Sequence, residues 1–145
     1  MPLPRPVPGL VIRYSYLWLE EHRRGREEGV KDRPCAIILA TRSDDGDESV
    51  TVLPITHSQP NDPALALEVP PATKQRLGLD GERSWIVLSE ANRFVWPGPD
   101  LRPAIAGDSN SIAYGLLPEK LFLQMRDRFL ALLQRASAHA VRRTE

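Results

Sequence analysis

Alternating apolar and polar positions near the start of the chain predict a β-strand. Over residues 9–19, apolar and aromatic side chains occupy every second position: Leu10, Ile12, Tyr14, Tyr16 and Trp18. Successive side chains of a strand point to opposite faces, so this pattern indicates a strand with one buried face. Residues 34–41 form a continuous apolar run instead, which predicts a strand buried on both faces.

Further short strands and one helix follow. Strand-like patterns occur at residues 49–56, 64–69, 84–90, 92–96 and 111–115. Residues 42–48 are acidic and contain Asp45-Gly46, which predicts a hairpin turn. Residues 118–134 have helical periodicity, and we expect this helix to pack on the sheet through one apolar face. That face carries Leu121, Met125, Phe129 and Leu132.

Short strands followed by one helix, without strand–helix alternation, predict a small barrel or a curled sheet. We expect an extended lead-in over residues 1–8, one domain over residues 9–136 and a frayed tail over residues 137–145. Residues 20–32 are strongly charged and contain two glycines, so we expect a long solvated loop there.

Composition narrows the possible classes of protein. The chain has 145 residues, with 19 basic and 19 acidic side chains and one cysteine. One cysteine excludes an internal disulfide framework and a cysteine-rich metal site. The zero net charge argues against extensive binding to a nucleic-acid backbone, although a short basic groove is compatible with it. No apolar stretch approaches the roughly 20 residues of a membrane span, so we expect a cytoplasmic protein without membrane contact.

Clusters at strand ends offer candidate chemistry. Arg33 precedes Pro34 at the entry to the apolar strand, and its planar guanidinium suits a phosphate. Thr56, His57 and Ser58 end another strand with two hydroxyls and a group that exchanges protons near neutral pH. A solvated arginine and an ordinary turn with hydroxyl caps are the respective structural alternatives.

A third cluster combines the carboxylate of Glu90, the amide of Asn92 and the cation of Arg93, for which an exposed ion pair is the alternative. A metal-dependent nuclease would need clustered carboxylates. The acidic residues at 44, 45 and 47 lie in a predicted hairpin tip, where a solvated turn is favoured. The three histidines show no metal-ligand spacing, so we expect no metal and no cofactor.

The order of these motifs resembles the PemK/MazF family of toxins from type II toxin–antitoxin systems. Residues 25–34 are similar to the family's Gly-x-Glu-Gln loop that ends in Arg-Pro. Pro54-Ile55-Thr56 matches a strand ending in Pro-x-Thr, and residues 115–118 match a Gly-x-Leu-x turn into a helix. The chain diverges where Glu28 and Ala91 replace glutamine, and where Leu88 replaces an arginine that is catalytic in some members.

The resemblance implies an SH3-like β-barrel, formed by a curved antiparallel sheet, with a C-terminal α-helix. It also implies a homodimeric, metal-independent endoribonuclease that cuts single-stranded RNA by 2′-hydroxyl attack and is blocked by a cognate antitoxin protein. On this basis Arg33 stabilises charge, Thr56 holds a phosphate oxygen and Glu90 acts as a base or orients Arg33. His57 is the proton shuttle closest in sequence to this cluster.

We expect the four catalytic candidates to meet at one rim of the barrel, because each lies at a strand end. Six further residues are candidate RNA contacts: Arg24, Arg26, Lys31, Ser58, Asn92 and Arg93. The alternative function is a non-catalytic SH3-like module, an inactive family member, that binds a partner protein or nucleic acid.

Overall fold

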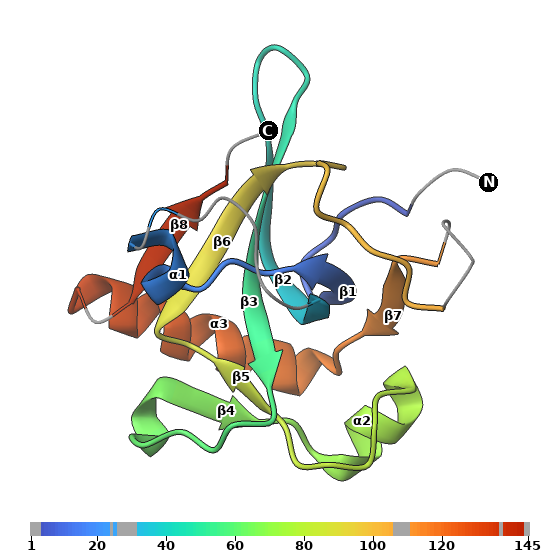
Figure 1. Ribbon diagram of the computed structural model, residues 1–145, viewed down its shortest axis with the longest axis vertical. Helices are drawn as coiled ribbons and strands as arrows, with labels where there is room; N and C mark the ends of the chain where they lie inside the picture. Colours follow the sequence, from blue (N-terminus) through green and yellow to red (C-terminus); the bar gives the residue numbers. More distant parts are fainter. Residues whose placement is uncertain (1–3, 24, 26–31, 106–110, 137, 144–145) are drawn as a thin grey trace.

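The computed structural model describes residues 4–23, 25, 32–105, 111–136 and 138–143, which form a mainly β fold (Figure 1). The strands are β1 (Leu10–Ser15), β2 (Asp32–Arg42), β3 (Glu48–Thr56), β4 (Ala66–Glu68), β5 (Trp85–Val87), β6 (Glu90–Val95), β7 (Ala113–Leu116) and β8 (His139–Arg142). The helices are α1 (Leu19–Arg23), the short 3-10 helix η1 (Pro63–Leu65), α2 (Pro71–Leu77) and α3 (Glu119–Gln134).

The strands form one curved sheet in the order β4-β5-β3-β2-β1-β7, and outside this order β6 pairs with β3 and β8 pairs with β6. Strand β3 is long enough to serve two partners on one edge. Its residues 49–52 pair with β6, and its end at Ile55 and Thr56 pairs with β5. The predicted curved antiparallel sheet is confirmed, although it is not closed and the β6–β8 pair is parallel.

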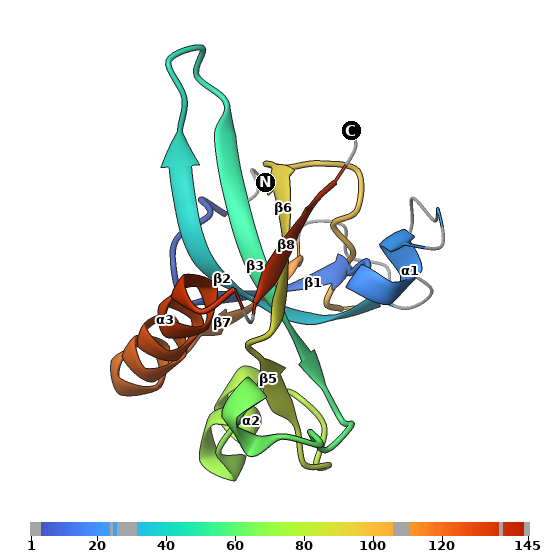
Figure 2. The same ribbon diagram turned by 90° about the vertical axis from the view of Figure 1, so that its left-hand side faces the viewer.

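Both faces of this sheet are buried, because alternate residues of the central strands enter two different cores. On one face Ile12 and Tyr14 of β1 pack with Phe94 of β6. On the other face Val11 packs in the cluster that contains Met125 of α3. Helices α1 and α3 accordingly lie on opposite sides of the sheet (Figure 2).

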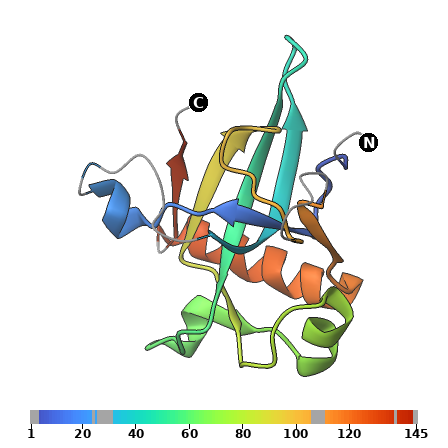
Figure 3. The same ribbon diagram turned by 45° about the vertical axis from the view of Figure 1, so that its right-hand side comes forward.

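Helix α3 lies across the sheet (Figure 3), and it packs by the face that the sequence predicted. Its four buried residues are Leu121, Met125, Phe129 and Leu132. The helix ends one turn before β8, and its outer side carries charged residues together with the exposed Leu130. In the described part of the chain, no helix has the length and apolar character needed to cross a bilayer.

Two segments differ from the sequence expectation. Residues 139–142 were expected to fray, but they form β8 beside β6 and bury Val141. Arg143, the next residue, is also buried, with only 4% of its surface exposed. Part of the expected loop at residues 20–32 is helix α1, whereas residues 24 and 26–31 lie outside the described residues.

Candidate functional site

A pocket of about 350 Å³ opens where β1, β2 and the end of β3 meet the segment after α2. Three of the four predicted catalytic residues line it, namely Arg33, Thr56 and His57. The structure therefore brings together the Arg-Pro and Pro-x-Thr motifs, which are more than twenty residues apart in the chain. The other lining residues that carry polar or charged groups are Arg13, Asp32, Lys74, Asp80, Ser84 and Tyr114.

Strand register places these side chains. Arg33 enters the pocket region from β2, where it lies opposite Tyr14 of β1. Thr56 is the last residue of β3, and His57 follows it directly. On the other wall, α2 ends at Gly78, whose left-handed conformation (φ 71°, ψ 23°) suits glycine and turns the chain towards Asp80.

Two guanidinium groups supply positive charge to the pocket. Arg33 lies over the ring of Trp18, with its central carbon 4.8 Å from the ring centroid. Among the described residues no carboxylate pairs with Arg33, and its Nε atom is buried without a hydrogen-bond partner. Arg13 lies near Tyr114 on the same wall. A cation that has no carboxylate partner can bind an anionic group such as a phosphate.

As far as the described residues show, the Thr56 hydroxyl has its proton available for a ligand. Its Oγ1 atom accepts a hydrogen bond from the backbone N–H of Ser58 at 3.2 Å. A hydroxyl is both donor and acceptor, so this contact leaves the O–H free to donate. Ser58 itself is exposed and adjoins the pocket in sequence, but it is not among the lining residues.

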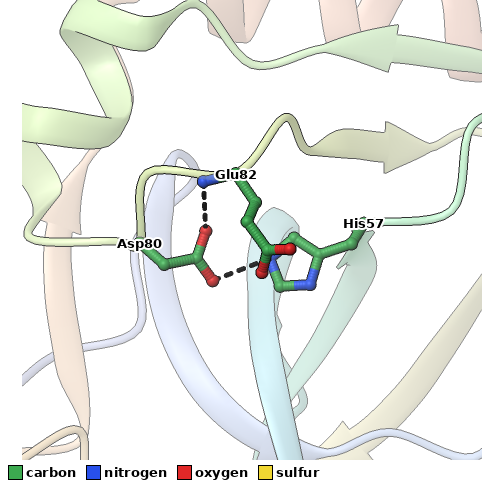
Figure 4. A group of neighbouring side chains, drawn as sticks. All are labelled: His57, Asp80 and Glu82. Atoms are coloured by element: carbon green, nitrogen blue, oxygen red, sulfur yellow. Dashed lines mark hydrogen bonds and ion pairs between the residues drawn. The ribbon is translucent and has the colours of Figure 1, made fainter.

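His57 forms a close pair with Asp80 (Figure 4). Its Nε2 atom lies 2.7 Å from Asp80 Oδ2 and 3.8 Å from Glu82 Oε2. The hydrogen bond from Lys74 is the main cause that lowers the pKa of Asp80, partly opposed by desolvation. Ionised Asp80 can only accept, so the proton of neutral His57 lies on Nε2. The other ring nitrogen points away from both carboxylates and is the one able to take a proton.

His57, Asp80 and Glu82 also have the spacing of possible metal ligands. One donor atom from each of His57, Asp80 and Glu82 lies within 4.8 Å of the other two. However, the Lys74 ammonium is 2.7 Å from Asp80 Oδ1, and it would repel a divalent cation bound at that carboxylate. The geometry therefore favours an acid–base pair over a metal centre.

Glu90, the fourth catalytic candidate, does not line the pocket. Its Oε1 atom accepts hydrogen bonds from the Tyr16 hydroxyl at 3.1 Å and from the backbone N–H of Leu19 at 2.8 Å. These two contacts hold the carboxylate, and in the part of the chain that the structure describes no ion pair joins Glu90 to Arg33 or Arg93. Burial raises the pKa of Glu90, and the two hydrogen bonds oppose that shift.

This raised pKa has a measurable consequence for stability. A carboxyl group with a higher pKa when folded binds more protons in the folded state, so the unfolding free energy falls as pH rises through that raised pKa. Glu90→Gln keeps an oxygen for Tyr16 and Leu19 but does not ionise. We expect the variant to gain stability relative to the wild type as pH rises above about 4.3. Urea unfolding across this range checks this, and a pH-independent difference would contradict it.

The six candidate RNA contacts separate into three groups. Asn92 is fully buried, where it bonds both backbone groups of Leu17, so it cannot contact RNA. Arg93 is exposed on β6 but does not line the pocket, whereas Ser58 adjoins it. The remaining three lie outside the described residues: Arg24, Arg26 and Lys31.

Sequence reasoning missed Arg13, Lys74, Asp80 and Tyr114. Each looks ordinary in sequence, since Arg13 is a polar position of a strand and Lys74 a polar position of a short helix. Asp80 precedes Gly81, which indicates only a turn. Nothing in the chain signals that this turn faces His57, because the contact depends on where β3 and α2 end.

Comparisons with known proteins do not identify the chain. It matches no protein-family model, and a search of curated proteins finds no match. The similarity to the PemK/MazF family therefore rests on the short motifs described above and stays a prediction.

Proposed function

We propose that this protein is a metal-independent endoribonuclease that cleaves single-stranded RNA through attack by the RNA's own 2′-hydroxyl. One observation supports this most directly. Within the described residues, the pocket combines an arginine that pairs with no carboxylate, a hydroxyl whose proton is available and a histidine paired with an aspartate, in Arg33, Thr56 and His57. These are the groups that phosphodiester cleavage requires: charge stabilisation, orientation of the phosphate and proton transfer.

The proposed reaction uses each group at a defined point. The His57 imidazole takes the proton of the 2′-hydroxyl, and the 2′-oxygen forms a bond to phosphorus. Negative charge that develops on the phosphate is stabilised by Arg33 and by the Thr56 hydroxyl. The bond from phosphorus to the 5′-oxygen then breaks, and that oxygen takes a proton from solvent. The products are a 2′,3′-cyclic phosphate and a 5′-hydroxyl end.

RNA cleavage by the purified protein in the presence of a chelator tests this function. Arg33→Ala should lower the cleavage rate about a hundredfold, comparable to the loss of one oxyanion-stabilising donor. Arg42→Ala is the matched control, because Arg42 is an exposed arginine at the β2–β3 hairpin, paired with Glu48. RNA with 2′-deoxyribose at the scissile position should resist cleavage. Equal rates for the wild type and Arg33→Ala would contradict the proposal.

The same experiment addresses the alternative function. A non-catalytic binding module would bind RNA or a partner protein at this pocket but release no cyclic phosphate. We also propose, from the family resemblance alone, that the protein is a toxin that forms a homodimer and is blocked by an antitoxin protein. Sedimentation of the purified chain and its co-purification with a protein encoded beside it would test these assemblies.

A further inference from the structure

Lys74 is an unusual residue in the wall of the pocket, because its side chain is only 6% exposed. Lysine is rarely buried to this extent unless its charge is paired. It lies in the short helix α2, six residues before Asp80. The ammonium group faces Asp80, Ser84 and the backbone of Glu82, all in the segment that follows the helix.

The Lys74 ammonium is fully occupied by these contacts. Nζ donates to Asp80 Oδ1 at 2.7 Å, to Ser84 Oγ at 2.7 Å and to the carbonyl oxygen of Glu82. An ammonium group has three protons, so no donor remains for a phosphate. Lys74 is therefore placed to hold Asp80 and is poorly placed to bind a substrate.

The two oxygens of the Asp80 carboxylate have different partners. Oδ1 accepts from Lys74 and from the backbone N–H of Glu82 at 3.1 Å. Oδ2 is left for His57, whose Nε2 lies 2.7 Å away. The buried lysine and the turn thus fix one oxygen, and this fixes the direction from which the other oxygen meets the imidazole ring.

We propose that Lys74 and Asp80 are positioning residues that hold His57 with its proton on Nε2 and leave Nδ1 as the atom that exchanges a proton with the substrate. This inference rests on the proposed role of His57 in RNA cleavage, and it assigns the reacting nitrogen. An aspartate that orients a catalytic histidine in this way fixes the ring tautomer, and replacing it by asparagine permits the wrong tautomer.

Nitrogen NMR of the His57 ring tests the assignment without any RNA, because the chemical shifts of Nδ1 and Nε2 distinguish the two neutral tautomers. The wild type should show predominantly the Nε2–H form. Asp80→Asn should lower the ratio of Nε2–H to Nδ1–H about tenfold, the order expected for loss of a charge-assisted hydrogen bond at a half-exposed site. Glu82→Gln is the control, since Glu82 Oε2 lies 3.8 Å from Nε2, beyond hydrogen-bond distance, and its ratio should change far less than that of Asp80→Asn.

Lys74→Met tests the buried anchor, because methionine fills the space but cannot hold Asp80. Its tautomer ratio should shift in the same direction as in Asp80→Asn. If Lys74→Met does not fold, Ser84→Ala, which removes one contact of the ammonium, replaces it and should give a smaller shift in that direction. A wild-type ring with its proton on Nδ1, or ratios that do not change in Asp80→Asn, would overturn the inference.

Cleavage assays separate this inference from the proposed function. In Asp80→Asn the value of kcat should fall about a hundredfold or more while KM stays close to that of the wild type, because the tautomer matters in the transition state. A wild type without ribonuclease activity would refute the proposed function, whatever the NMR shows. An active wild type whose His57 tautomer ignores Asp80 would refute the positioning role alone.

Discussion

Replacing His57 by alanine is expected to slow RNA cleavage at neutral pH by about two to four orders of magnitude, the usual contribution of a positioned acid or base. RNA affinity should change little, because a proton shuttle acts in the transition state and not in the bound ground state. The binding groups of the pocket, Arg33 and Thr56, remain in place in this variant. The loss should therefore appear in the rate constant of the cleavage step, measured under single-turnover conditions, and not in the affinity for RNA.

His139→Ala is the matched control for this variant. His139 is an exposed residue of β8 whose backbone N–H, and not its ring, contacts Ser89. Removing its ring should leave cleavage unchanged. If His57→Ala cleaved RNA at the wild-type rate, His57 would have no part in the mechanism, and the ribonuclease proposal would rest on Arg33 and Thr56 alone.

Much of the fold follows from local patterns in the chain. The continuous apolar run of β2 predicted a strand buried on both faces, and residues 35–38 are buried. The periodicity of α3 predicted its buried face because a helix on a sheet needs one apolar stripe. Strand β8 escaped prediction because its sequence, His139–Arg142, has little apolar character. Its position depends on pairing with β6, about fifty residues earlier.

The candidate site was predictable only where a motif marks a strand end. Arg33 and Thr56 adjoin or belong to such motifs, and the sheet brings both into one pocket. Glu90 also lies at a strand end, but its carboxylate turns to Tyr16 and Leu19, and no local pattern reveals this direction. Asp80 was missed because it is distant from His57 in sequence. It contacts the imidazole across the pocket, and no pattern near either residue indicates this contact.

The C-terminal segment carries a buried charge network that also has no local signal. Arg143 and Asp100 form an ion pair, with 3.0 Å between Nη2 and Oδ2 and side-chain exposures of 1% and 9%. Nη1 of Arg143 donates to the carbonyl oxygen of Ser15 at 2.7 Å and to Asn92 Oδ1 at 3.0 Å. The network ties β8 to β1, β6 and the loop that contains Asp100, and so connects the end of the chain to the strand that leads to Arg13 in the pocket.

Arg143→Met is therefore expected to lower the unfolding free energy by about 3–5 kcal/mol, because it removes the Arg143 counter-charge from the buried Asp100 carboxylate. For a chain of this size that corresponds to a fall in Tm of roughly 10–20 °C. Arg142→Met, one residue earlier on the exposed side of β8, is the matched control and should change Tm little.

The double variant Arg143→Met, Asp100→Leu separates the loss of an ion pair from the loss of packing. Replacing both members of a buried pair by apolar residues is often close to neutral, so the double variant should recover much of the stability that Arg143→Met loses. Thermal and urea unfolding of four proteins would measure this: the wild type, Arg143→Met, Arg142→Met and the double variant. A single variant as stable as the wild type would show that the network does not hold the C-terminal strand. A double variant less stable than Arg143→Met would show that the Asp100 side chain makes stabilising contacts apart from its pair with Arg143.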